Sequence, residues 1–244
     1  MSNSGTATVP ASTTPGQLAR CAGVLLSPTR TMRAVVARPR WAGVLVLTSI
    51  VATLCAGGLR LTAVGRQATL DQQVRTVEGF GRHLTDPEYA TLQQVDRYAA
   101  PIGAAQGLIG TPLAVVVLAL LCFGYFNGRS PGTARFTQVV AVVAHAGVVL
   151  AVQQLIGAPL AYLRQTLSSP TNLSAVFPVF DQGSFLAGLA GSVDLFRLWW
   201  VVVLAIGLGT LYRRRSGPIV LGLCGIYLAI GIVAAAIQVA TGGV

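Results

Sequence analysis

Long apolar segments alternate with shorter polar segments along most of the chain. A helix needs about 20 apolar residues to cross the hydrocarbon core of a bilayer. Segments of this kind lie at about 41–60, 103–126, 136–158, 194–212 and 218–240. Each is predicted to be a helix, because a backbone in lipid must form its hydrogen bonds within its own segment. The pattern therefore predicts an all-α integral membrane protein with a five-helix bundle over residues 41–244.

The polar region between the first two spans, residues 61–100, carries a helical pattern of its own. Leu70, Val74 and Val77 recur at helical spacing. The sequence Thr-Asp-Pro-Glu at 85–88 is a capping-box pattern with proline in the first turn, which is typical of a helix start. We expect the first two spans to extend out of the membrane as an antiparallel helical hairpin, in preference to an unstructured loop.

Composition agrees with a membrane protein. Hydrophobic residues make up 53% of the chain and charged residues 10%, whereas a soluble domain carries about a quarter charged residues. So few charges cannot cover a water-facing surface, which excludes a soluble globular protein. Arginine supplies all seventeen basic residues. This bias suggests a GC-rich genome, and with it the cytoplasmic membrane of a bacterium.

Charge is distributed unequally between the two sides of the predicted bundle. One side carries seven arginines and seven acids, while the other carries ten arginines and no acid. By the positive-inside rule the basic side is cytoplasmic, which places the N-terminus inside and the C-terminus outside. The ten arginines border apolar segments, so we expect anionic lipids as partners and no nucleic acid. They are Arg20, Arg30, Arg33, Arg38, Arg40, Arg129, Arg135, Arg213, Arg214 and Arg215.

The region before the first span divides into two parts. Residues 1–16 are rich in serine, threonine and proline, which predicts a disordered tail. Residues 17–40 place Met32, Val35 and Val36 between arginines at roughly helical spacing. This predicts an interfacial helix on the cytoplasmic leaflet. The other interpretation is a group of charges that sets topology without forming an ordered helix.

Few polar residues lie within the predicted spans. Gln138, His145 and Gln153 occur in the third span, where a polar residue is a functional candidate by default. No acid lies at the centre of any span, so hydrogen bonding between helices is favoured over a proton relay or substrate path. The sequence contains no recognised catalytic motif. We therefore expect no enzymatic activity, no cofactor and no metal site.

An acid and a base stand at the start of the fourth span. Ser192 is suited to cap this helix, with Asp194 in its first turn and Arg197 one turn further on, where the two charges can pair. Trp199 and Trp200 fit the aromatic belt of an outer membrane interface. A second interpretation has Asp194 reaching into the bundle to hold another helix or a ligand.

Glycines lie where helices would pack closely. Gly103 and Gly107 form a small-xxx-small pattern, with Gly110 next on the same side. Small residues of this kind let helix backbones approach each other. Close packing is favoured over a broken transporter helix, because no matching segment occurs in a second half of the chain.

Three short motifs precede or open the first, third and fourth spans. They are Ser27-Pro28 with Pro39 and Trp41; Phe136 with Gln138; and Asp194, Leu195, Phe196, Trp199 and Gly207. In these residues, and in their order over about residues 20–240, the chain resembles bacterial members of the Yip family, the Ypt/Rab-interacting membrane proteins. The resemblance implies five spans with a cytoplasmic N-terminus. The long outer hairpin departs from the compact eukaryotic pattern.

The resemblance also bears on function. Eukaryotic members are linked to membrane traffic and small GTPases, and some bacterial members accompany transporter or export systems. We expect a non-catalytic scaffold or accessory subunit that holds a protein partner or a second copy of itself. The alternative is a small permease or lipid-handling protein with a polar intramembrane cavity. That alternative requires Gln138, His145, Gln153 and Asp194 to face one cavity.

Overall fold

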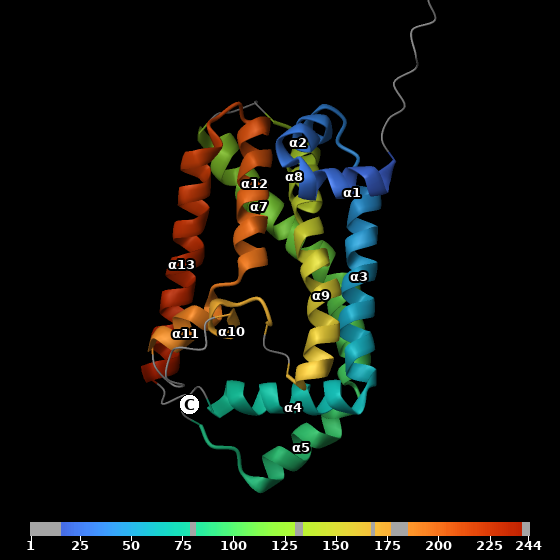
Figure 1. Cartoon of the computed structure of the whole chain (residues 1–244), viewed down its shortest axis with the longest axis vertical. Helices are drawn as coiled ribbons and strands as arrows, with labels where there is room; N and C mark the ends of the chain where they lie inside the picture. The colour runs from blue at the N-terminus through green and yellow to red at the C-terminus, as the bar shows by residue number, and fades with distance from the viewer. Residues whose placement is uncertain (1–15, 79–81, 130–133, 167–168, 177–184, 241–244) are drawn as a thin grey trace, which may run out of the picture.

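The computed structural model describes residues 16–78, 82–129, 134–166, 169–176 and 185–240 (Figure 1). All regular elements in these ranges are helices, as predicted, and the tail predicted at 1–16 lies almost wholly outside them. The helices are α1 (Gln17–Leu26), α2 (Pro28–Ala37), α3 (Ala42–Leu61), α4 (Ala63–Glu78), α5 (Asp86–Asp96), α6 (Ala99–Ala105), the π-helix η1 (Gln106–Gly110), α7 (Thr111–Arg129), α8 (Phe136–Ala146), α9 (Val148–Arg164), α10 (Leu173–Val176), α11 (Phe185–Ser192), α12 (Leu195–Leu211) and α13 (Ser216–Ala240).

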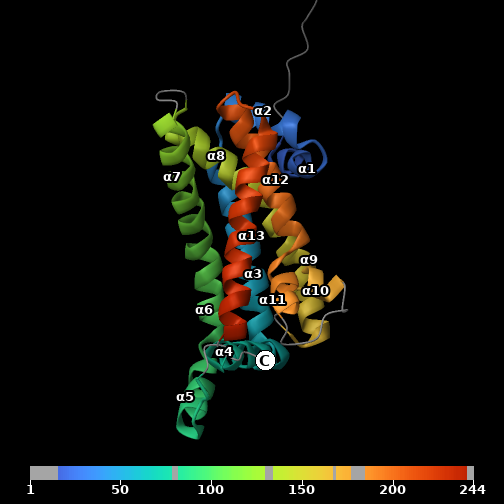
Figure 2. The same cartoon turned by 90° about the vertical axis from the view of Figure 1, so that its left-hand side faces the viewer.

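Within the described ranges, four helical rods are long and apolar enough to cross a membrane. They are α3, the continuous rod of α6, η1 and α7, the rod of α8 and α9, and α13. The apolar helix α12, with 17 residues, is shorter and runs beside them (Figures 1 and 2). The described residues thus form an all-α fold with four membrane-length rods. The predicted fifth crossing depends on α12.

The rod of α8 and α9 forms the centre of the helical assembly. Every residue from Val139 to Ala146 is buried, because α2, α3, α7 and α12 all contact α8. By contrast, α13 packs on α11 and α12 and keeps most of its apolar side chains exposed. Burial of apolar area inside the protein therefore stabilises α8 far more than α13.

Glycine sets the closest helix contacts. A Cβ atom at Gly107 of η1 would lie 2.3 Å from the backbone nitrogen of Thr53 in α3. At Gly207 of α12 it would lie 2.5 Å from Cγ1 of Val142 and 3.1 Å from Sδ of Met32. The close-packing interpretation of these glycines is therefore supported by the structure.

The N-terminal segment folds as two helices rather than one. Ser27 leaves the helical conformation with φ −146°, and Pro28 then occupies the first turn of α2. Proline is well suited to this position because it lacks the backbone N–H that the first turn cannot use. Met32 and Val35 are fully buried against the bundle, where α2 contacts α8 and α12, instead of facing lipid. The segment therefore covers one end of the bundle.

At the opposite end, α4 and α5 form the two helices predicted between the first spans. The capping box is confirmed: the Thr85 backbone N–H donates to Oε2 of Glu88 over 3.0 Å. The pKa of Glu88 lies below its ordinary value, mainly because of this backbone hydrogen bond. The hydrogen bond from the Thr85 hydroxyl and the positive charge of Arg82 lower the pKa further. The helices do not prolong the spans, however. The chain turns at Thr62, and α4 lies across the end of the bundle (Figure 1).

Candidate functional site

Asp194, the acid that the sequence analysis singled out, lies at the start of α12 and is buried, with 2% of its surface exposed. The segment before α10 runs antiparallel to it. The Leu173 backbone N–H donates to the Val193 carbonyl over 2.9 Å, and the Leu195 N–H donates to the Thr171 carbonyl over 3.2 Å. These bonds fix the backbone on both sides of the carboxyl group.

One carboxylate oxygen of Asp194 caps α12. Oδ1 accepts the backbone N–H of Phe196 over 2.8 Å and that of Arg197 over 3.2 Å. Asp194 is therefore itself the N-cap, and the assignment of Ser192 to this role is wrong. The Ser192 hydroxyl instead donates to the Leu189 carbonyl in the last turn of α11. An aspartate cap satisfies N–H groups that a helix start would otherwise leave unbonded.

The other oxygen of Asp194 binds a different part of the chain. Oδ2 accepts a hydrogen bond from the hydroxyl of Ser169 and a second one, over 2.7 Å, from the hydroxyl of Thr171. The backbone N–H of Asp194 donates to the Tyr227 hydroxyl of α13 over 3.0 Å, and that hydroxyl donates to the Ser192 carbonyl over 2.7 Å. We call Ser169, Thr171, Ser192, Asp194 and Tyr227 the Asp194 junction. It joins α11, α12, α13 and the segment before α10.

Arg197 contributes to the junction through its backbone. Its side chain is exposed, and among the described residues no ion pair joins it to Asp194 or to another acid. The predicted pairing of these charges is therefore not observed. The rings of Phe196 and Trp199 are tilted by 41° with centroids 6.0 Å apart, and both side chains pack partly buried against the core.

The polar residues of the third predicted span point to separate partners. Gln138 accepts the Arg135 backbone N–H over 2.9 Å and donates to the Val36 carbonyl over 3.2 Å, which joins α8 to α2. His145 is buried and donates from Nδ1 to the Ala141 carbonyl of its own helix over 2.7 Å. Gln153 is partly buried on α9. The hydrogen bonds of Gln138 and His145 are thus separate from the Asp194 junction.

The motif before the first span also has structural roles. Pro28 starts α2, and Pro39 lies in the link that follows it. Trp41 occupies the N-cap position of α3 and is exposed at the same end of the bundle. Gly207 leaves the space that Met32 and Val142 fill. Pro28 and Gly207 thus shape the packing of α2 onto the bundle.

In chemical terms, the Asp194 junction is a hydrogen-bonded anchor. Within the described ranges, no three histidine, cysteine, aspartate or glutamate side chains gather as a metal site would require. Sequence reasoning missed Ser169, Thr171 and Tyr227. Only Tyr227 could have been noticed in the sequence, because it carries a hydroxyl group within the long apolar segment of α13.

Comparison with known proteins places most of the chain in one family. The model of the Yip1 domain matches residues 22–238. The matched range begins within α1 and ends within α13, so it contains every motif discussed above. A search of curated proteins finds no match. None is found among solved structures either.

Proposed function

Because the chain belongs to the Yip1 family, we propose that it acts without catalysis, as a membrane scaffold or accessory subunit. In this role it holds protein partners and lipids together in complexes for membrane organisation, trafficking or transport. The setting we propose is the cytoplasmic membrane of a bacterium. A second copy of the chain is one candidate partner.

The observation that carries this proposal is a basic surface at one end of the bundle. Nine exposed arginines lie on α2, on its link to α3, and at the neighbouring ends of α7, α8, α12 and α13 (Figures 1 and 2). We call them the basic end: Arg30, Arg33, Arg38, Arg40, Arg129, Arg135, Arg213, Arg214 and Arg215. Near an anionic leaflet each arginine contributes about 1 kcal/mol of attraction.

The proposal includes five membrane crossings, with α12 as the fourth. Its 17 residues lie at the lower limit of about 17–25 for a membrane helix. Crossing by α12 places α2 and the α12–α13 link on the same side, where the basic end lies. By the positive-inside rule that side is cytoplasmic.

The proposed topology predicts a pattern of cysteine labelling. In a variant without the native cysteines, an impermeant maleimide should label Ala90→Cys in intact cells, because α5 lies outside. Arg215→Cys should be labelled after the membrane is opened. Both positions are exposed, so access to the reagent depends on the side of the membrane. Labelling of both cysteines in intact cells would contradict the topology.

The scaffold role is tested by affinity purification of the full chain in a mild detergent. We expect reproducible companion proteins with the unaltered chain and their loss with Arg30→Gln/Arg33→Gln, which removes two exposed charges from α2. The matched control is Arg75→Gln/Arg164→Gln, which removes the same charge from exposed positions at the opposite end. Companions that survive both changes, or that never appear, would count against the proposal.

A further inference from the structure

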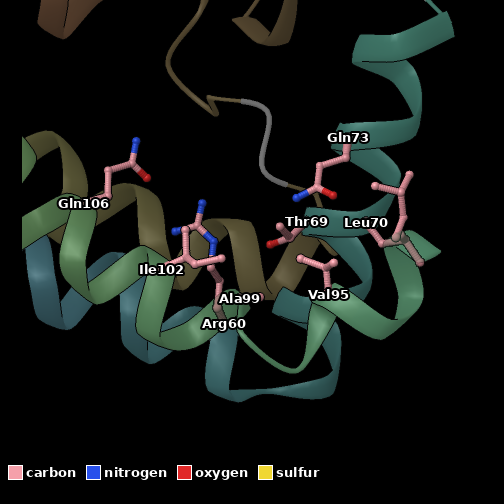
Figure 3. Close-up of a pocket in the computed structure, with 9 residues that line it drawn as sticks. Arg60, Thr69, Leu70, Gln73, Val95, Ala99, Ile102 and Gln106 are labelled. Carbon is pink, nitrogen blue, oxygen red and sulfur yellow. The ribbon is translucent and has the colours of Figure 1, made fainter. Parts of the chain in front are cut away.

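A cavity of about 240 Å³ lies where α4 and α5 meet the ends of α3 and α6 (Figure 3). Apolar side chains from α4, α5 and α6 form one wall, among them Leu70, Val95 and Ile102. Polar groups of Arg60, Thr69, Gln73 and Gln106 complete the described lining. The cavity therefore combines an apolar wall with one positive charge. None of the motif residues of the family lines it.

Arg60 reaches the cavity from the last turn of α3 and is half-buried. Its Nη1 donates to the Ala56 carbonyl of its own helix over 3.1 Å. A guanidinium has further N–H donors in a planar fork that matches carboxylate and phosphate groups. In the described part of the chain no acid forms an ion pair with it. The positive charge that Arg60 brings to the cavity thus has no ion-paired acid among the described residues.

Gly103 makes the room that this guanidinium occupies. A Cβ atom at this position of α6 would lie 2.6 Å from Nη1 and 3.0 Å from Cδ of Arg60. Any larger residue would therefore push the Arg60 side chain away from α6. The glycine and the arginine together keep a positive group in the lining of the cavity.

The rim of the cavity carries both polar and apolar exposed side chains. Gln73 and Gln106 are exposed and carry amides that can donate hydrogen bonds to a ligand. Gln106 also begins the π-helix η1, a type of distortion that is frequent at functional sites. Val95 and Ile102 are 42% and 55% exposed. Exposed apolar side chains continue beyond them on η1 and α7, at Leu108, Ile109 and Leu113.

We propose that this cavity binds the phosphate group of an anionic membrane amphiphile. Arg60 pairs with the phosphate, and Gln73 and Gln106 hydrogen-bond its oxygens. The volume suits a headgroup, since sites for drug-sized molecules measure about 300–1,000 Å³. The acyl chains lie outside the cavity on the apolar surface of η1 and α7. This proposal is independent of the scaffold role, because it involves none of the arginines of the basic end.

Binding is measured on the full chain in a neutral detergent, by native mass spectrometry during titration with phosphatidylglycerol. We expect Arg60→Gln to weaken binding about tenfold, because a charge-assisted hydrogen bond is lost. Arg60→Lys retains the charge and should restore part of the affinity. The matched control Arg75→Gln removes an exposed charge from α4 outside the described lining and should leave the affinity unchanged.

Two further ligands distinguish the sources of the phosphate. Phosphatidylcholine should bind more weakly than phosphatidylglycerol, because its choline neutralises the headgroup. Inorganic phosphate should compete poorly with phosphatidylglycerol, because it lacks acyl chains. Efficient competition would show that the cavity binds the free anion and would overturn the proposal of an amphiphile. Equal binding of the two lipids would contradict the proposal that the cavity binds an anionic phosphate group. Equal effects of Arg60→Gln and Arg75→Gln would contradict it as well.

A variant on the rim covers the case in which Arg60→Gln does not fold. Gln106 is exposed, so Gln106→Leu should preserve folding and weaken phosphatidylglycerol binding about threefold. Unchanged affinity in this folded variant would overturn the proposed contact. Arg30→Gln/Arg33→Gln should bind phosphatidylglycerol at the cavity normally. Failure of the scaffold proposal and failure of the cavity proposal therefore give different results.

Discussion

Asp194→Ala is expected to lower the free energy of unfolding by about 3 kcal/mol. The substitution removes the cap of α12 and leaves the hydroxyls of Ser169 and Thr171 without the carboxylate that accepts them. Each lost partner of a buried polar group costs about 1–3 kcal/mol. Unfolding by SDS in mixed micelles, followed by tryptophan fluorescence, measures the change.

Two other variants separate the contributions within the Asp194 junction. Asp194→Asn retains a good capping residue and should cost about 1 kcal/mol, since the hydroxyls can rotate to meet an amide. Arg197→Gln should change stability by less than about 0.5 kcal/mol, because exposed charges contribute little. A cost for Arg197→Gln equal to that of Asp194→Ala would show that an ion pair, and not the observed hydrogen bonds, stabilises the junction.

Gly107→Ala is expected to destabilise the contact between η1 and α3 by about 3 kcal/mol. The added Cβ would lie 2.3 Å from the Thr53 backbone nitrogen and 2.5 Å from its Cα, and backbone atoms cannot move aside as a side chain does. The two helices must therefore separate, and buried contacts along both are lost. The same SDS titration reports the change.

The matched control for this prediction is Gly110→Ala in the same π-helix. Here the nearest atom to the added Cβ is Cγ of Gln106 at 3.6 Å, an ordinary contact. We expect a change smaller than about 1 kcal/mol, as for glycine and alanine elsewhere in helices. Similar destabilisation by both substitutions would indicate sensitivity of η1 as a whole, and not the close approach at Gly107.

The positions of the membrane-length helices follow from the sequence because lipid leaves the backbone few alternatives. The ends of these helices are predicted less accurately from the sequence. The third span was predicted to end near 158, yet α9 continues to Arg164 and stops where Gln165 adopts φ 54°. The second rod begins earlier than predicted, at Ala99. Apolar composition locates the lipid-facing part of a helix, whereas local backbone geometry and capping decide where it stops.

The Asp194 junction could be predicted in part. The sequence identified Asp194 as unusual and suggested that it holds another part of the chain. It placed the cap at Ser192, however, with Asp194 in the first turn, whereas α12 starts at Leu195, after the backbone pairing of Val193 with Leu173. Ser169 and Thr171 lie more than twenty positions away. No sequence period links groups that meet through tertiary folding.

The surface on which α2 packs could not be predicted from the sequence either. Its alternation of apolar and basic residues is equally compatible with a lipid surface and with a protein surface. Met32 and Val35 are buried by protein because Gly207 and its neighbours leave a recess for Met32. The distinction depends on the shape of a distant helix. Such complementarity is visible in coordinates and not in a pattern along one segment.

The order of the junction's partners along the chain has a consequence for its biosynthesis. Ser169 and Thr171 precede Asp194, whereas Tyr227 follows it by 33 positions. A nascent chain therefore carries the hydroxyl donors of the carboxylate before the carboxylate itself leaves the ribosome. The charge of Asp194 can be stabilised by these hydrogen bonds as soon as α12 is made. The last helix then docks, through one tyrosine, onto a helix start that is already complete.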